Sequence, residues 1–204
     1  MSDAIFTRPD VWTGGSYELA VEVGPRDDEA VRRALQAIWT APSLDGCFPL
    51  ADREPHEQAR VAIPECTLDA PLHGVARIGS RPPIACRTLV IRYDDGLDWL
   101  HLCLPIGALE CVLPVGMFPF DDGGDLAWRP ELDEWLCELA RRVFQAVPFR
   151  LGFVGWEGGE FDDVEAFDAS GVPSERWVGY LVASQGRLQW HPPTEGAPLA
   201  FGAD

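Results

Sequence analysis

The sequence predicts an α+β fold in which a mainly antiparallel sheet packs against two principal helices that form a single layer. Several segments have the alternating pattern of strands and are joined by short turns, whereas only the segments at about 27–39 and 130–147 have the apolar repeat of a helix. With 47 % hydrophobic residues, a chain of 204 residues can bury a sizeable core. We expect one domain over residues 1–190 and a loosely ordered tail over 191–204, which is rich in proline.

The N-terminal part predicts one strand followed by one helix. Residues from Tyr17 to Val23 alternate between apolar and polar, which is the period of a half-buried strand. Asp27 is a suitable N-cap for the first helix, whose apolar stripe ends at Trp39. The stretch 40–58 has no such period, and we expect irregular structure there.

The middle of the chain predicts strands. Two strand-like pieces lie around 59–67 and 72–78. A clear hairpin follows, in which Cys86–Tyr93 and Leu97–Leu104 are joined by a turn that ends at Gly96. A glycine in that turn can take the positive φ that a tight hairpin requires.

The second helix has the strongest signals at its ends. Pro130 suits the first turn, and the acidic residues Glu131, Asp133 and Glu134 follow it at the positive end of the helix dipole. Pro148 follows its close.

The C-terminal part predicts a strand at Phe149–Trp156, an acidic loop over 157–168 and a final hairpin. Its arms are Arg176–Ala183 and Leu188–Trp190, across the turn Gln185-Gly186.

Charge excludes several classes of function. The chain has 16 basic residues, all of them arginine, against 33 acidic ones, for a net charge of −17. Without lysine there is no Schiff base and no P-loop. Binding of nucleic acid and of anionic membranes gains from cationic residues, so we expect neither as a partner.

The acidic residues gather in two segments. Seven lie within 121–138 and six within 157–168. Such clusters attract a basic protein and accelerate association at low salt. The alternative is that they only solvate loops and keep the protein in solution.

No motif predicts catalysis. Cys47 lies in a loop but no family signature surrounds it, and His101 with Cys103 would share one face of a strand without completing a metal site. The glycine-rich segment 152–159 is followed by carboxylates that would repel phosphate. We expect no cofactor and no metal.

The N-terminus lacks a basic start and an apolar run, and no stretch is long enough to span a bilayer. We therefore expect a cytoplasmic protein with its six cysteines reduced.

These observations favour a non-enzymatic acidic protein that inhibits a basic effector by covering its surface, in the manner of an immunity protein or antitoxin against a bacterial toxin such as a nuclease. The expected contact residues combine carboxylates with aromatic anchors. They are Asp121, Asp122, Asp125, Trp128, Trp156, Glu157, Glu160, Phe161, Asp162 and Asp163. The alternative is a metal-dependent or acid/base hydrolase that uses Asp121, Asp125, Glu157 and Glu160.

Overall fold

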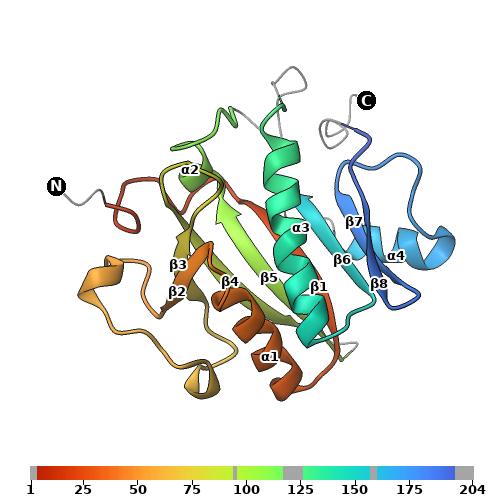
Figure 1. Cartoon of the computed structure of the whole chain (residues 1–204), viewed down its shortest axis with the longest axis horizontal. Coiled ribbons are helices and arrows are strands. Elements are labelled where there is room, and N and C mark those ends of the chain that lie inside the picture. Colours follow the sequence, from red (N-terminus) through yellow and green to blue (C-terminus); the bar gives the residue numbers. More distant parts are fainter. Residues whose placement is uncertain (1–3, 94–95, 117–125, 157–159, 196–204) are drawn as a thin grey trace.

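In the part of the chain that the structure describes, an eight-stranded antiparallel sheet with four α-helices forms the fold (Figure 1), which confirms the predicted α+β class. The computed structural model describes residues 4–93, 96–116, 126–156 and 160–195, with the backbone alone at 160–163 and 166. The strand order is β2-β3-β4-β5-β1-β6-β7-β8, and every neighbouring pair is antiparallel. The strands are β1 (Ser16–Pro25), β2 (Leu44–Phe48), β3 (Leu72–Ala76), β4 (Ile84–Arg92), β5 (Leu97–Pro105), β6 (Leu151–Trp156), β7 (Gly179–Ser184) and β8 (Arg187–His191).

The first strand of the chain lies at the centre of the sheet. β1 pairs with β5 along one edge and with β6 along the other, so Tyr17 lies opposite both Leu104 and Trp156. Because neighbours cover both edges of β1, its residues from Ser16 to Val23 are buried. Side chains alternate between the two faces of a strand, so Tyr17 lies on one face and Glu18 on the other.

The two principal helices pack side by side on one face of the sheet (Figure 1). They are α1 (Asp28–Trp39) and α3 (Arg129–Ala146), each within about one residue of its predicted bounds. The Asp27 side chain accepts a hydrogen bond from the Glu29 backbone N–H, as an N-cap does. The short α2 (Ile106–Leu109) follows β5.

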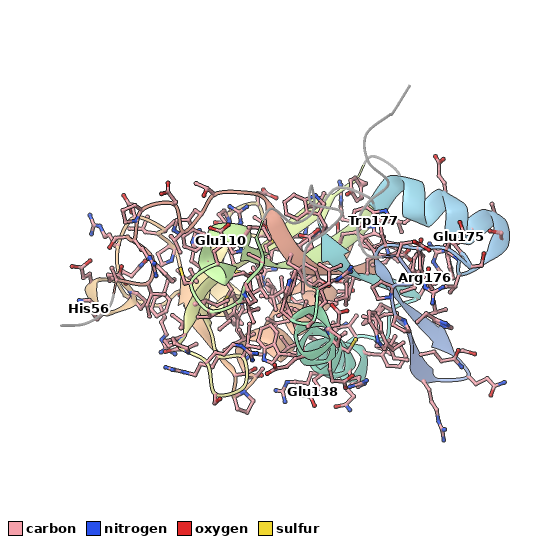
Figure 2. The ribbon with its side chains drawn as sticks, turned by 90° about the horizontal axis from the view of Figure 1, so that it is seen from above. His56, Glu110, Glu138, Glu175, Arg176 and Trp177 are labelled. Carbon is pink, nitrogen blue, oxygen red and sulfur yellow. The ribbon has the colours of Figure 1, made fainter. Side chains whose placement is uncertain are left out.

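A further helix covers part of the opposite face (Figure 2). This is α4 (Glu160–Ser170), and it lies in the segment predicted to be an acidic loop, so that prediction was wrong. Val164 and Phe167 pack on the sheet through Phe153 and Tyr180, and the acidic residues hide this weak apolar stripe in the sequence. Arg150 joins the helix to the sheet.

That arginine binds carboxylates from two elements. Its Nη2 lies 2.6 Å from an oxygen of Glu22 on β1, and its Nη1 forms an ion pair with Asp168 on α4. The two principal helices still form one layer, and α4 adds to the other face.

The segment between α1 and β3 differs from its prediction in two places. β2 forms within 40–58, where irregular structure was expected, and Gly46 interrupts its apolar pattern. Around 59–67 the predicted strand is absent, and the short 3₁₀ helices η1 (Pro55–Glu57) and η2 (Ile63–Glu65) flank an extended stretch. Pro64 has no N–H for a strand ladder, which explains this correction.

The last hairpin confirms its prediction. Gln185 and Gly186 turn the chain from β7 to β8 with φ values of 51° and 74°. Beyond β8, the backbone N–H groups of Thr194 and Glu195 both donate to the carbonyl of Arg176, so this part of the expected tail is attached to the domain. Residues 196–204 lie outside the described ranges.

Within the described ranges, no helix has both the length and the apolar composition needed to cross a bilayer.

Candidate functional site

A groove lies between the first turns of α3 and the chain at and after β8. Its cavity volume is about 330 Å³, which is near the lower end of the range for sites that bind small ligands or single side chains. We call it the α3–β8 groove. It is lined by Leu126, Arg129, Pro130, Asp133, Glu134, Trp190, Pro192, Pro193, Thr194 and Glu195.

A buried polar network forms the base of the groove. Asp133 is only 6 % exposed, and its Oδ1 accepts a hydrogen bond from the hydroxyl of Tyr17 on β1. The Arg129 Nε donates to the same hydroxyl at 3.1 Å, and its Nη2 donates to the carbonyl of Trp177 at 2.9 Å. Arg129 and Asp133 are four residues apart, so they lie on one face of α3.

Burial changes the acidity of both members of this network. It raises the pKa of Asp133 to about 6, although Tyr17 and Arg129 oppose the shift. The pKa of Tyr17 is also raised, first by burial and then by the charge of Asp133. A carboxylate that is costly to bury and lines a groove is typical of a functional site rather than of a packing role.

The rim of the groove combines an indole with carboxylates. Trp190 is half-buried and forms one wall. Glu134 is exposed on the opposite wall, where one of its oxygens lies 2.8 Å from Nη1 of Arg141. Glu195 is exposed beside Trp190, and its own backbone is fixed to Arg176.

The position of the Trp190 ring depends on a glycine. A Cβ placed on Gly179 would lie 1.8 Å from Cη2 of Trp190, so the ring rests directly on the backbone of β7. We expect Gly179→Ala to turn the indole outward and to lower the free energy of unfolding by about 1–3 kcal/mol. Chemical denaturation measures the cost, and the NMR signal of the Trp190 indole N–H reports the displacement. An unchanged indole signal would show that this ring is not held by Gly179.

The structure places the predicted contact residues unevenly. Asp121, Asp122, Asp125 and Glu157 lie outside the described residues. Glu160, Phe161, Asp162 and Asp163 form the first turn of α4, where only the backbone is described. The hydrolase alternative, which draws on the same carboxylates, therefore has no described geometry.

The two predicted tryptophans are less available than expected. Trp128 is only 4 % exposed and packs edge to face on Tyr17, with ring centroids 5.4 Å apart. It therefore supports the base of the groove. Trp156 ends β6 and is partly buried against the main core.

Sequence reasoning missed the residues that form the α3–β8 groove. It interpreted Asp133 and Glu134 only as favourable charges at the positive end of the helix dipole, and it placed Glu195 in the tail beyond the domain. One signal was present: Arg129 and Asp133 are separated by four positions, and both interrupt the apolar stripe of α3.

Among the residues that the structure describes, the cysteines and histidines form no catalytic or metal centre. All six cysteines are free, as predicted, and burial raises the pKa of the Cys47 thiol to about 11, so that it is not a reactive thiolate near neutral pH. His101 and Cys103, which the sequence places on one face of a strand, both contact Glu18. One oxygen of Glu18 lies 3.3 Å from Nδ1 of His101, and the other accepts a hydrogen bond from Sγ of Cys103 at 3.2 Å. Among the described residues, no three potential ligands are grouped so that they could hold a metal ion.

Comparison of the chain with protein-family models, with curated proteins and with solved structures finds no match.

Proposed function

We propose that this protein is a non-enzymatic inhibitor that binds a basic effector protein and covers its surface. A bacterial toxin, such as a nuclease, has the charge that this proposal requires. The α3–β8 groove would lie at the centre of the contact. The observation that carries the proposal is the composition of this groove, which places three carboxylates beside an indole.

The charge of the chain supports the choice of a basic partner. Acidic residues outnumber basic ones by 33 to 16, and two of the three carboxylates of the groove, Asp133 and Glu134, lie on a helix that also carries Glu131 and Glu138. A cationic surface gains most where carboxylates are partly desolvated and near an aromatic ring. Nucleic acid would be repelled by the same groups.

Inhibition would follow from occlusion. Long-range attraction would guide the partner, and the groove would then bury a basic side chain of the partner and hold the two surfaces together. The carboxylates at 121–125 and 157–163 would add to the long-range attraction through their charge.

The salt dependence of association tests this mechanism. The partners to test are those products of neighbouring genes that carry a net positive charge, each immobilised for surface plasmon resonance. We expect the association rate of the partner that binds to fall at least about tenfold between about 50 mM and about 500 mM salt, because the screening length shortens about threefold. A rate that does not change with salt would contradict steering by charge.

Charge reversal locates the contact. We expect the double change Glu134→Arg with Glu195→Arg to remove binding while the thermal midpoint stays nearly unchanged, because exposed charges contribute little to folding. Asp52→Arg is the matched control. Asp52 is exposed and precedes η1, which carries His56 and lies at the end of the molecule opposite β8 (Figure 2). Loss of binding with the control alone would place the contact elsewhere.

A further inference from the structure

The base of the α3–β8 groove contains a carboxylate oxygen that accepts no hydrogen bond from the part of the chain that the structure describes. Asp133 is 6 % exposed, and only its Oδ1 is bonded, by the Tyr17 hydroxyl. Its Oδ2 has no hydrogen-bond partner among the described residues, and the side chain lines the groove. A carboxylate in a largely buried side chain gains from a charged donor that reaches its free oxygen.

The other charged group at the base already donates elsewhere. The Arg129 guanidinium bonds Tyr17 through Nε and Trp177 through Nη2, and its centre lies 5.7 Å from the centroid of the Tyr17 ring. These bonds direct it toward β1 and β7. Neither of these two bonds reaches Oδ2 of Asp133, and a donor that enters from the groove can meet this oxygen.

The walls of the groove suit a flat cation. On one side lies the indole of Trp190, whose face can stack against a guanidinium. Pro130, Pro192 and Pro193 add rigid apolar surface that can contact a methylene chain. Glu195 lies at the rim, exposed and without a described ion pair, where it can bind a second edge of the same cation.

We propose that the α3–β8 groove binds the side chain of an arginine, with the guanidinium stacked on Trp190 and bonded by Asp133 and Glu195. This inference rests on the proposed function and names the chemical group of the partner that the groove recognises. Arginine fits better than lysine, because a planar guanidinium can stack on the indole and donate to two carboxylates at once.

The test uses the full-length protein and a small probe, N-acetyl-L-arginine amide, followed through the NMR signal of the Trp190 indole N–H. The signal is assigned by its loss in Trp190→Phe. We expect it to shift and to saturate with a dissociation constant on the order of millimolar. The citrulline analogue has nearly the same shape but no charge, and should cause no shift. The lysine analogue should bind several times more weakly.

Variants separate the base from the rim. Asp133→Asn should weaken binding of the arginine probe at least about tenfold, because it removes the negative charge that the guanidinium of the probe faces in the groove. Glu195→Gln should weaken it about two- to fivefold, as expected for an exposed ion pair. Glu195→Gln also keeps the test valid if Asp133→Asn does not fold. Glu138→Gln makes the same change of charge further along α3, outside the groove, and should leave the affinity unchanged (Figure 2).

The outcomes distinguish this inference from the proposed function. If the indole signal does not respond to the arginine probe, or responds equally to citrulline, the groove is not an arginine site, even if the basic partner binds with the predicted salt dependence. If the lysine probe binds as tightly as arginine, the claim of guanidinium recognition is wrong. If the arginine probe binds as expected but no basic protein does, the groove is confirmed and the inhibitory function is not.

Discussion

Replacing Gly74 with alanine is expected to lower the free energy of unfolding by at least about 3 kcal/mol, at the upper end of what overpacking a core costs. A Cβ at Gly74 would lie 2.3 Å from Cζ3 of Trp39 and 2.9 Å from the carbonyl oxygen of Asp45. The first atom belongs to a buried ring at the end of α1, and the second to the backbone of β2. Neither can move away without separating the helix from the sheet or β2 from β3.

Thermal and chemical denaturation measure this effect. In a domain of this size, a loss of about 3 kcal/mol lowers the midpoint by about 6–12 °C. Gly186→Ala is the control. That glycine, unlike Gly74, has a positive φ of 74°, which favours glycine, and a Cβ there would meet no atom within 4 Å. Its cost should therefore be only about 1–2 kcal/mol.

A double-mutant cycle identifies the cause. In a Trp39→Leu background the ring is absent, so Gly74→Ala should cost clearly less than in the native protein. An equal cost in both backgrounds would mean that the indole is not the obstacle. The comparison with Gly179→Ala is informative, because Trp190 is only partly buried and can swing aside whereas Trp39 is buried.

Replacing Asp133 with asparagine is expected to stabilise the protein above pH 6 by up to about 3 kcal/mol. Burial raises the pKa of Asp133 to about 6 from an ordinary value of 3.8. The ionised carboxylate is therefore disfavoured in the folded protein. Well below pH 3.8 the carboxyl group is protonated in both the folded and the unfolded protein, so it does not lower the free energy of unfolding. As pH rises toward 6, the unfolded chain ionises first, and stability falls until the folded protein ionises as well.

Asparagine has nearly the shape of the protonated acid, and its Oδ1 can still accept from the Tyr17 hydroxyl. Denaturation at pH 4 and at pH 8 should therefore show nearly equal stability at the lower pH and a more stable variant at the higher pH. Glu138→Gln, on the exposed side of the same helix, should change stability by less than about 0.5 kcal/mol at either pH. A variant that is less stable than the native protein at pH 8 would mean that the charge of Asp133 stabilises the fold.

Together with the arginine probe, this variant tests whether Asp133 is kept for binding. A residue that lowers stability but is required for affinity shows the trade-off expected of a functional site. A variant that is more stable and binds arginine equally well would leave Asp133 with no role in the groove.

Local patterns predicted the elements whose periodicity is strong. α1 and α3 have apolar stripes and clear end signals. The turns of the two hairpins end at Gly96 and Gly186, and both glycines have a positive φ. The weak elements were missed. β2 is only five residues long and contains Gly46, and it forms because it pairs with β3 and covers Trp39. Its existence depends on contacts with residues far away in the chain.

The sequence could predict the acidic character of the candidate site but not its location. The excess of acidic residues favoured a basic partner, but the expected contact residues were taken from the densest clusters of charge. The α3–β8 groove instead combines the first turns of α3, up to Glu134, with Trp190 and Glu195, which lie more than 50 positions later in the chain. No pattern within one segment can reveal that neighbourhood.

The amino-acid sequence by itself determined the α+β class, the two principal helices and the negative charge, because these follow from periodicity and composition along the chain. Only the tertiary structure decided that β1 lies at the centre of the sheet, that Trp128 is buried, and that Asp133 lies at the base of a groove. The reason is physical: the cost of burying a carboxylate, and its value to a ligand, depend on which distant side chains surround it.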